Sequence, residues 1–164
     1  MAVVKKLLNH DREFVEIIQA VADIETQVQL QDAWSCETLV ELFEQDSIDM
    51  LIVYDELQEK KNNHEKLVGY CLYQVTFEQA EILRIGTRPD YQRQGIASQI
   101  FATLDTELID KQVESLLLEV RADNAPAIAL YEQQRFSVIH QRLGYYHIPN
   151  QPAVDALIMQ RVYN

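Results

Sequence analysis

The sequence predicts a single α/β domain, residues 1–164, built on a mixed, largely antiparallel sheet. Two early segments carry apolar residues at three- and four-residue spacing, as amphipathic helices do, and several later runs of β-branched and aromatic residues are typical of strands. We expect about six or seven strands and about four helices, in the order ααβββαβαββ after a short N-terminal strand. A chain of this length can bury about two thirds of its unfolded surface in one core.

The first half of the sequence supplies the short strand, at Val3 and Val4, and two helices. Residues 12–24 predict the first helix, since apolar side chains recur along one face. Ser35 is expected to cap the second helix. The apolar side chains of the two helices are Phe14, Ile17, Ile18, Val21 and Ile24 in the first, and Leu39, Leu42 and Phe43 in the second.

The remaining elements follow from apolar runs and their end signals. The run SLLLEV is almost continuously apolar and predicts a strand buried on both faces. Asn124 is expected to cap a short helix that tolerates Pro126 in its first turn. The predicted strands are 50–55, 67–76, 80–87, 115–120, 137–144 and 154–162, and the predicted helices are 98–111 and 125–134.

The charge is strongly acidic and unevenly distributed. The formal net charge is −12, and residues 11–59 hold fourteen acids against one base, Arg12. This balance disfavours nucleic acid as a direct partner and could attract a basic protein or peptide, although the charge by itself favours a solvated, solubilising surface. The acids of this acidic segment are Asp11, Glu13, Glu16, Asp23, Glu25, Asp32, Glu37, Glu41, Glu44, Asp46, Asp49, Asp55, Glu56 and Glu59.

Other features predict a cytoplasmic protein without a metal site. No apolar run approaches the ~20 residues that cross a bilayer, and the N-terminus lacks the apolar core of a signal peptide. Cys36 and Cys71 form no CxxC pair and are expected to be reduced thiols. The four histidines have neither metal-ligand spacing nor a nucleophile motif beside them.

The heptapeptide YQRQGIA, residues 91–97, lies between a predicted strand and a predicted helix. A glycine at such a turn permits close backbone approach, and the first amides of the new helix suit an anion such as phosphate. The motifs of P-loops and dinucleotide-binding turns are absent. From the heptapeptide alone, an ordinary turn whose glycine relieves strain is about equally well supported.

Four segments together resemble the GNAT family of N-acetyltransferases. Residues 92–97, QRQGIA, match its Gln/Arg-x-x-Gly-x-Gly/Ala signature, and residues 118–136, LEVRADNAPAIALYEQQRF, resemble the RimI-type ribosomal-protein-alanine N-acetyltransferases. Ile24-Glu25 with Ala33-Trp34-Ser35, and Gly144-Tyr145-Tyr146, resemble the same group. The resemblance implies the GNAT fold, with acetyl-CoA as acetyl donor. One departure is Arg135, which stands where the family usually has a helix-ending glycine.

The resemblance also implies roles for individual residues. The turn would hold the cofactor pyrophosphate, backbone amides near residues 85–87 would polarise the thioester carbonyl, and Asn124 would contact the cofactor. The implied cofactor-binding residues are Ile85, Gly86, Thr87, Gln92, Arg93, Gln94, Gly95, Ile96, Ala97, Ser98 and Asn124.

Glu119 is implied as the general base and Tyr131 as the general acid of a direct transfer. Each has a structural alternative that the residues alone favour. Glu119 could be a strand-end acid paired with Arg121 or Arg84, and Tyr131 a core tyrosine on the helix face of Asn124. A water could also relay the proton to Glu119.

The resemblance implies the N-terminal alanine of ribosomal protein bS18 as acceptor. Trp34, Tyr145 and Tyr146 are candidates for contacting that peptide, and otherwise are core or rim aromatics. Two alternatives remain open: a GNAT enzyme acting on a small amine such as a polyamine or an amino acid, and a catalytically silent acyl-CoA-binding module.

Overall fold

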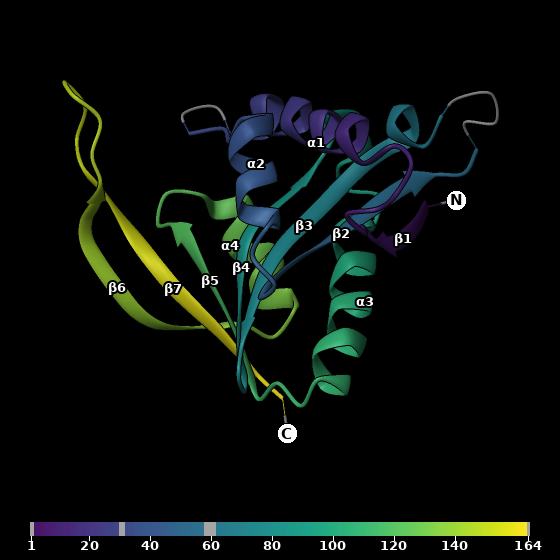
Figure 1. The fold of residues 1–164 in the computed structure, drawn as a ribbon. Coiled ribbons are helices and arrows are strands. Elements are labelled where there is room, and N and C mark those ends of the chain that lie inside the picture. The colour runs from purple at the N-terminus through teal and green to yellow at the C-terminus, as the bar shows by residue number, and fades with distance from the viewer. Residues whose placement is uncertain (1, 30–31, 58–61, 164) are drawn as a thin grey trace. The chain divides into compact units, whose positions relative to one another are not determined.

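The computed structural model describes residues 2–29, 32–57 and 62–163 (Figure 1). Hydrogen bonds order its seven-stranded sheet as β1-β2-β3-β4-β5-β7-β6, with β4 and β5 parallel. The predicted fold class is therefore confirmed. The elements are β1 (Ala2–Lys6), α1 (Phe14–Val28), α2 (Cys36–Phe43), β2 (Ile48–Asp55), η1 (Asn63–Lys66), β3 (Leu67–Thr76), β4 (Gln79–Thr87), η2 (Pro89–Tyr91), α3 (Ile96–Asp110), β5 (Ser115–Arg121), α4 (Ala125–Gln133), β6 (Ser137–Tyr146) and β7 (Val154–Val162).

The chain divides into two compact units, and each is described by itself. The N-terminal unit comprises residues 1–74 and 83–107, and the C-terminal unit comprises residues 75–82 and 108–164. The boundary falls within β3, β4 and α3, so these elements contribute to both units.

In the N-terminal unit, α1 and α2 cover one face of the strands β2 and β3 (Figure 1). The predicted apolar face of α1 is buried, and the helix begins and ends a few residues later than the sequence predicted. As predicted, Ser35 caps α2, because its side chain accepts a hydrogen bond of 3.2 Å from the Thr38 amide. The aromatic rings of Phe14 and Phe43 join the two helices at 5.4 Å.

A charged residue, Glu25, lies at the centre of this apolar core with no exposed surface. Its carboxylate accepts hydrogen bonds from the Tyr70 hydroxyl and, at 3.0 Å, from the Trp34 amide, and it lies 3.7 Å from Nε of Arg84. Burial, and next the Glu25 charge, raise the pKa of Tyr70 well above its usual value, which keeps the hydroxyl a donor. A buried carboxylate is tolerated only with such partners.

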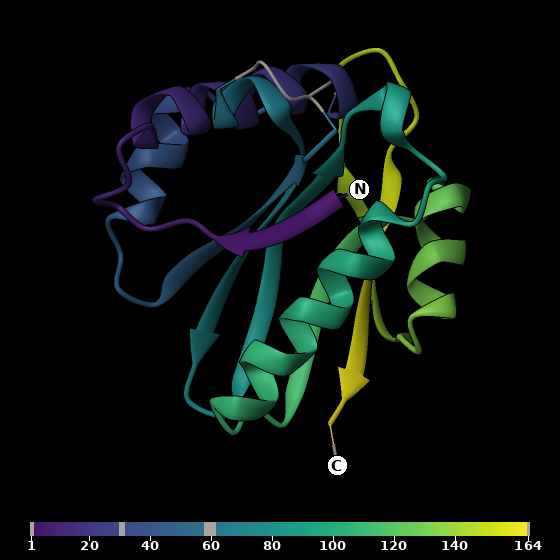
Figure 2. The ribbon, with the colours of Figure 1, turned by 90° about the vertical axis from the view of Figure 1, so that its right-hand side faces the viewer.

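Two glycines let β3, β4 and the start of α3 approach closely within the N-terminal unit. A Cβ at Gly86 would lie 2.7 Å from the Tyr70 hydroxyl oxygen, which is too close for any side chain. A Cβ at Gly69 would lie 3.1 Å from Cγ2 of Ile96, the first residue of α3. Figure 2 shows α3 running beside these strands. Small residues thus set the position of the segment between β4 and α3.

In the C-terminal unit, β5 pairs in parallel with the first residues of β4 and antiparallel with β7. Burial alternates along β5, with Leu116, Leu118 and Val120 buried and the side chains between them half-buried. The expectation that β5 is buried on both faces is therefore wrong, because one of its faces carries Glu119 and Arg121 and stays partly open to water. β6 and β7 form a long antiparallel pair (Figure 1).

Helix α4 has the predicted boundaries and the predicted cap. The Asn124 side-chain oxygen accepts a hydrogen bond of 3.3 Å from the Ala127 amide, and Pro126 sits in the first turn. After the helix, Arg135 adopts a left-handed conformation with φ +67°. The missing glycine has therefore not changed the helix end, because the arginine takes the backbone conformation that glycine favours.

The buried carboxylate generates a stability prediction. Glu25→Ala leaves Arg84 without its buried partner and removes the acceptor of two donors, so we expect a loss of about 3–5 kcal/mol in the free energy of unfolding. Asp23→Ala, at an exposed position on the same helix, should cost no more than about 0.5 kcal/mol. Urea denaturation of both variants measures the difference, and equal effects would contradict a structural role for the Glu25 cluster.

Candidate functional site

The turn between β4 and α3 lies in the N-terminal unit and contains residues 92–98. Gly95 has φ +83°, and a Cβ built there would meet nothing within 4 Å. Arg93 is also left-handed, at φ +63°, and its side chain is exposed. The Gln99 amide bonds to the Gly95 carbonyl at 3.1 Å, so the amides of residues 96–98 open a helix whose first N–H groups have no intrahelical acceptor.

Side chains of the turn hold its backbone in place. Nε2 of Gln92 donates to the Thr87 carbonyl at 3.2 Å, and Nε2 of Gln94 donates to the Asp90 carbonyl at 3.2 Å. Ile96 is buried, whereas Gly95 and Ser98 are exposed. The result is a fixed, open loop with an exposed arginine at the positive end of a 15-residue helix, which suits a phosphate group.

Glu119 lies on β5 in the C-terminal unit, with its side chain 25% exposed. One carboxylate oxygen accepts a hydrogen bond of 2.9 Å from the Tyr146 hydroxyl, and the other lies 3.4 Å from Nη1 of Arg142. Both ion-pair partners suggested by the sequence are wrong: Arg121 pairs with Asp123 at 3.0 Å, and Arg84 belongs to the Glu25 cluster. The carboxylate is therefore accessible to solvent, and two side chains of β6 fix its orientation.

A bulge in β6 brings both donors to Glu119. Arg142 pairs with Ala156 of β7, but Tyr146 pairs with Val154, so β6 carries extra residues between these positions. Gly144 in the bulge has φ +61°, and its amide donates to Asp155 at 2.7 Å. The bulge re-aims the strand, as bulges near functional sites do.

A second carboxylate, Glu81 of β4, belongs to the same C-terminal cluster. β4 and β5 pair Glu81 with Leu117, which places Glu119 two residues further along the same face of β5. Burial first, and then the charge of Glu119, raise the pKa of Glu81, while Arg142 acts in the opposite direction. The cluster thus contains two carboxylates, one guanidinium and one phenol.

The remaining candidates divide between the two units. Tyr131 is 8% exposed and packs edge-on against Phe136 at a centroid distance of 6.0 Å, the packing expected of a core tyrosine. Asn124, on the same helix, uses its side chain as the cap. Tyr145 packs edge-on against Tyr146 at 5.3 Å and is 52% exposed.

In the N-terminal unit, Trp34 lies under the guanidinium of Arg84 at 4.1 Å. Residues 85–87 form the end of β4, where Gly86 contacts Tyr70. The structure therefore brings Trp34 and the end of β4 into contact with the Glu25 cluster, and it groups Glu119 with Tyr146 in the C-terminal unit.

The acidic segment is only partly a surface feature. Glu37, Glu41 and Glu44 are exposed, but Glu25 is buried and Asp55 is 9% exposed. Glu59 lies outside the described residues. Cys36 and Cys71 are free, and burial raises the pKa of the Cys71 thiol, which disfavours a nucleophilic role.

The described ranges, 2–29, 32–57 and 62–163, contain no group of three or more histidine, cysteine or acidic side chains placed to hold a metal ion. No helix within them has the length and apolar character needed to cross a membrane.

A family model for the acetyltransferase (GNAT) family matches residues 15–136. The chain belongs to the GNAT family. The match includes the turn with Gly95, the strand with Glu119 and the helix with Tyr131. The predicted family is therefore confirmed, and the geometry described above is that of a GNAT protein.

Relatives of this GNAT chain include named N-acetyltransferases. The [ribosomal protein bS18]-alanine N-acetyltransferase of Escherichia coli (strain K12) is 40% identical over 94 residues, which are 57% of this chain and 63% of that protein. The sequence match thus spans less than two thirds of that relative. A Bacillus subtilis protein described as a putative enzyme of the same kind is 32% identical over 100 residues, 61% of this chain and 63% of that protein.

Solved structures extend the likeness across the fold. The crystal structure of the Escherichia coli ribosomal-protein-S18-alanine N-acetyltransferase has a TM-score of 0.80 at 30% identity, and covers 99% of this chain and 94% of that one. Arabidopsis thaliana NAA60 in complex with acetyl-CoA has a TM-score of 0.78 at 17% identity, covering 100% of this chain and 99% of that one, and shares the fold.

Sequence reasoning missed Glu81, Arg142 and the buried partners of Glu25. A signal existed for Glu25, because it continues the apolar spacing of Ile18 and Val21 and so falls on the buried face of α1. Arg142 had no such signal, since its approach to Glu119 depends on the bulge. Glu81 reaches the cluster only through strand pairing.

The raised pKa of Glu81 predicts a pH dependence of stability. Because the pKa of Glu81 is higher in the folded than in the unfolded state, the folded state binds more protons at pH values between the two. The free energy of unfolding therefore falls as pH rises through that range. Glutamine carries no charge, so Glu81→Gln should be more stable than the unsubstituted protein at neutral pH. This advantage should disappear at about pH 4, where Glu81 is mostly protonated in both states. Urea denaturation at both pH values measures this.

A double substitution separates the two causes of that shift. In a Glu119→Gln background, the neutral-pH advantage of Glu81→Gln should shrink, because the repelling charge has gone. A neutral-pH advantage of the same size in both backgrounds would contradict the assigned interaction between the two carboxylates.

Proposed function

We propose that this chain is an acetyl-CoA-dependent N-acetyltransferase that modifies the N-terminal alanine of ribosomal protein bS18. The observation that carries the proposal is the likeness to the Escherichia coli enzyme, at a TM-score of 0.80 over 99% of this chain and 30% identity. Family membership supports the acetyl-transfer reaction, and the name of the relative supports the acceptor.

The turn at residues 92–98 is the proposed binding site for the cofactor phosphates. Gly95 suits that role, since it leaves open space beside the first amides of α3, and Arg93 supplies an exposed cation. When bound, acetyl-CoA supplies a thioester, whose acetyl group is activated towards an amine. The amides of residues 85–87 are proposed to donate to the thioester oxygen, and Asn124 to contact the cofactor.

Glu119 is proposed to take the proton from the acceptor amine. An α-amine has a pKa of roughly 8 and is mostly protonated at neutral pH, so a base must remove its proton before the nitrogen can attack. A carboxylate 25% exposed can exchange that proton with solvent, directly or through a water. Tyr146 and Arg142 hold it in one orientation.

Tyr131 is proposed to give a proton to the departing sulfur. A phenol has a pKa of about 10 and stays protonated at neutral pH, whereas a thiolate has a pKa of about 8.5 and can accept its proton. The nitrogen–carbon bond forms as the carbon–sulfur bond breaks, and the products are an N-acetylated peptide and a free thiol.

A basic peptide is the acceptor class that the surface favours. Exposed acids of the acidic segment, such as Glu37, Glu41 and Glu44, would attract it and raise its encounter rate. Trp34, Tyr145 and Tyr146 are proposed to contact its first residues. We place the reaction in the cytoplasm, where ribosomal proteins are made.

The experiment that tests the proposal compares two acceptors. Purified protein and acetyl-CoA are mixed with an alanine-initiated bS18 peptide or with spermidine, and the released thiol is followed. The proposal predicts a higher kcat/KM for the peptide, and a steep fall of that value with added salt. Preference for spermidine would favour a small-amine acetyltransferase, and no thiol release with either would favour a silent acyl-CoA-binding module.

Tyr131→Phe should lower kcat by about a hundredfold or more with little change in acetyl-CoA affinity, because only the transferable proton is lost. Tyr73→Phe is the matched control, since it also removes a buried phenol oxygen, one with no hydrogen-bond partner in the described part of the chain. Steady-state kinetics on both variants measures kcat. An unchanged kcat in Tyr131→Phe would exclude Tyr131 as the general acid and leave it only a packing role in the core.

Glu119→Gln should lower kcat/KM by about a hundredfold or more and flatten the rising acid limb of the pH–rate profile. The amide keeps the size of the side chain but cannot accept the amine proton. Glu132→Gln changes an exposed carboxylate of α4 and should leave the profile intact. If the limb persists in Glu119→Gln with the same midpoint, the titrating group is another one.

A further inference from the structure

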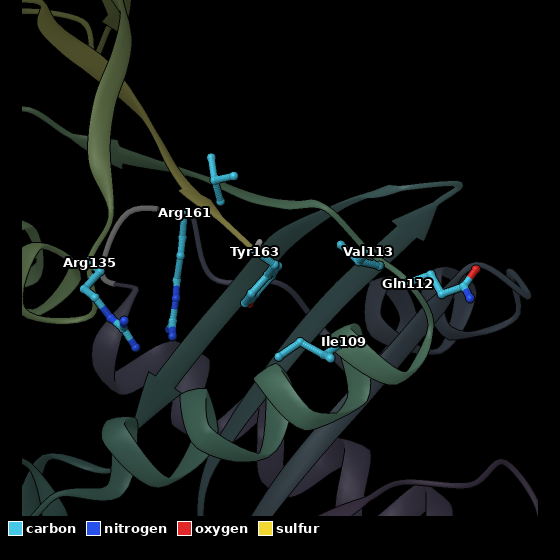
Figure 3. A pocket seen from close by; sticks show the side chains of 7 residues that line it. Ile109, Gln112, Val113, Arg135, Arg161 and Tyr163 are labelled. Carbon is cyan, nitrogen blue, oxygen red and sulfur yellow. The ribbon is translucent and has the colours of Figure 1, made fainter.

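A pocket of about 390 Å³ lies within the C-terminal unit, between the end of α3, the end of α4 and the last residues of β7 (Figure 3). None of the residues assigned above to acetyl transfer lines it. Arg135 and Arg161 do, together with the apolar side chains of Ile109 and Val162 and the ring of Tyr163.

The lining carries positive charge in a strongly acidic protein. Its seven residues include two arginines and no acid, whereas the chain as a whole has a net charge of −12. Figure 3 shows the side chains of Arg135 and Arg161 extending in the same direction from different elements. Like charges that face one pocket repel each other, and an anion between them would remove that cost.

Arg135 is held at this place at a conformational cost. Its φ of +67° is unusual for a residue other than glycine, and such strain tends to persist where a side chain is used. The Arg135 side chain forms no ion pair with any carboxylate that the structure describes. Its guanidinium is therefore available to a ligand.

Arg161 gives the pocket a more rigid wall. It is 9% exposed, and its guanidinium lies over the ring of Tyr163 at 5.5 Å. Such a stacked, nearly buried guanidinium has few rotamers left to lose on binding. Beside it, Ile109 is 59% exposed and Val162 57% exposed, so apolar surface adjoins the charged wall.

We propose that this pocket binds a small organic anion, with a carboxylate or phosphate group between Arg135 and Arg161 and an apolar body against Ile109 and Val162. Guanidinium groups pair with both kinds of anion through two parallel hydrogen bonds. The site lies outside the acetyl-transfer residues, so it does not depend on the proposed function.

Calorimetry on the full chain tests the site with phenyl phosphate, phenylacetate and the cation benzylamine. At least one of the two anions should bind, and benzylamine should not. Arg135→Gly should weaken anion binding about tenfold or more, the usual value of a charge-assisted hydrogen bond. Tighter binding of phenyl phosphate identifies a phosphate ester as the ligand class, and tighter binding of phenylacetate a carboxylic acid.

Arg135→Gly is the informative variant because glycine relieves the left-handed strain. Its melting temperature should equal or exceed that of the unsubstituted protein, so lost binding cannot be attributed to unfolding. Arg12→Gln removes an exposed arginine of the N-terminal unit that has no part in either proposed site, and it should leave the affinity unchanged. The proposal is overturned if neither anion binds at millimolar concentration, if Arg135→Gly binds as tightly as the unsubstituted protein, or if Arg12→Gln weakens binding as much as Arg135→Gly does.

Discussion

The buried carboxylate of Glu25 is the interaction on which the N-terminal unit depends. It joins α1 to the Trp34 segment, to Tyr70 of β3 and to Arg84 of β4, in the middle of an otherwise apolar core. Because an unpaired charge there would be costly, the four segments can be buried only in the arrangement that satisfies it. Tyr70 in turn packs against Gly86, so the same cluster sets the end of β4, which leads into the turn with Gly95.

The C-terminal unit treats its charges differently. Glu119 and Glu81 remain in contact with water, and the cluster balances two carboxylates with Arg142 and a hydrogen bond from Tyr146. A carboxylate that must exchange protons needs this partial exposure, whereas Glu25 needs its exclusion from water. One acidic chain thus uses similar side chains for packing in one unit and, in our proposal, for proton transfer in the other.

Local patterns in the sequence predicted most of the fold. Ser35 and Asn124 cap the helices as expected, and β3 has the predicted limits, because caps and apolar runs are properties of neighbouring residues. The partners of Glu119 could not be predicted. Arg142 reaches it through a bulge at Gly144, whose extra residues change the register of β6 in a way that no local pattern encodes.

The central claim is that the transferred acetyl group ends on an α-amine of a ribosomal protein. Intact bS18 beginning with alanine can be incubated with this protein and acetyl-CoA, and the modified atom located by tandem mass spectrometry. The account predicts acetylation of the alanine α-amine, with the lysine side chains unmodified. Acetyl groups found only on lysine side chains, or an unmodified N-terminus after complete turnover, would contradict it.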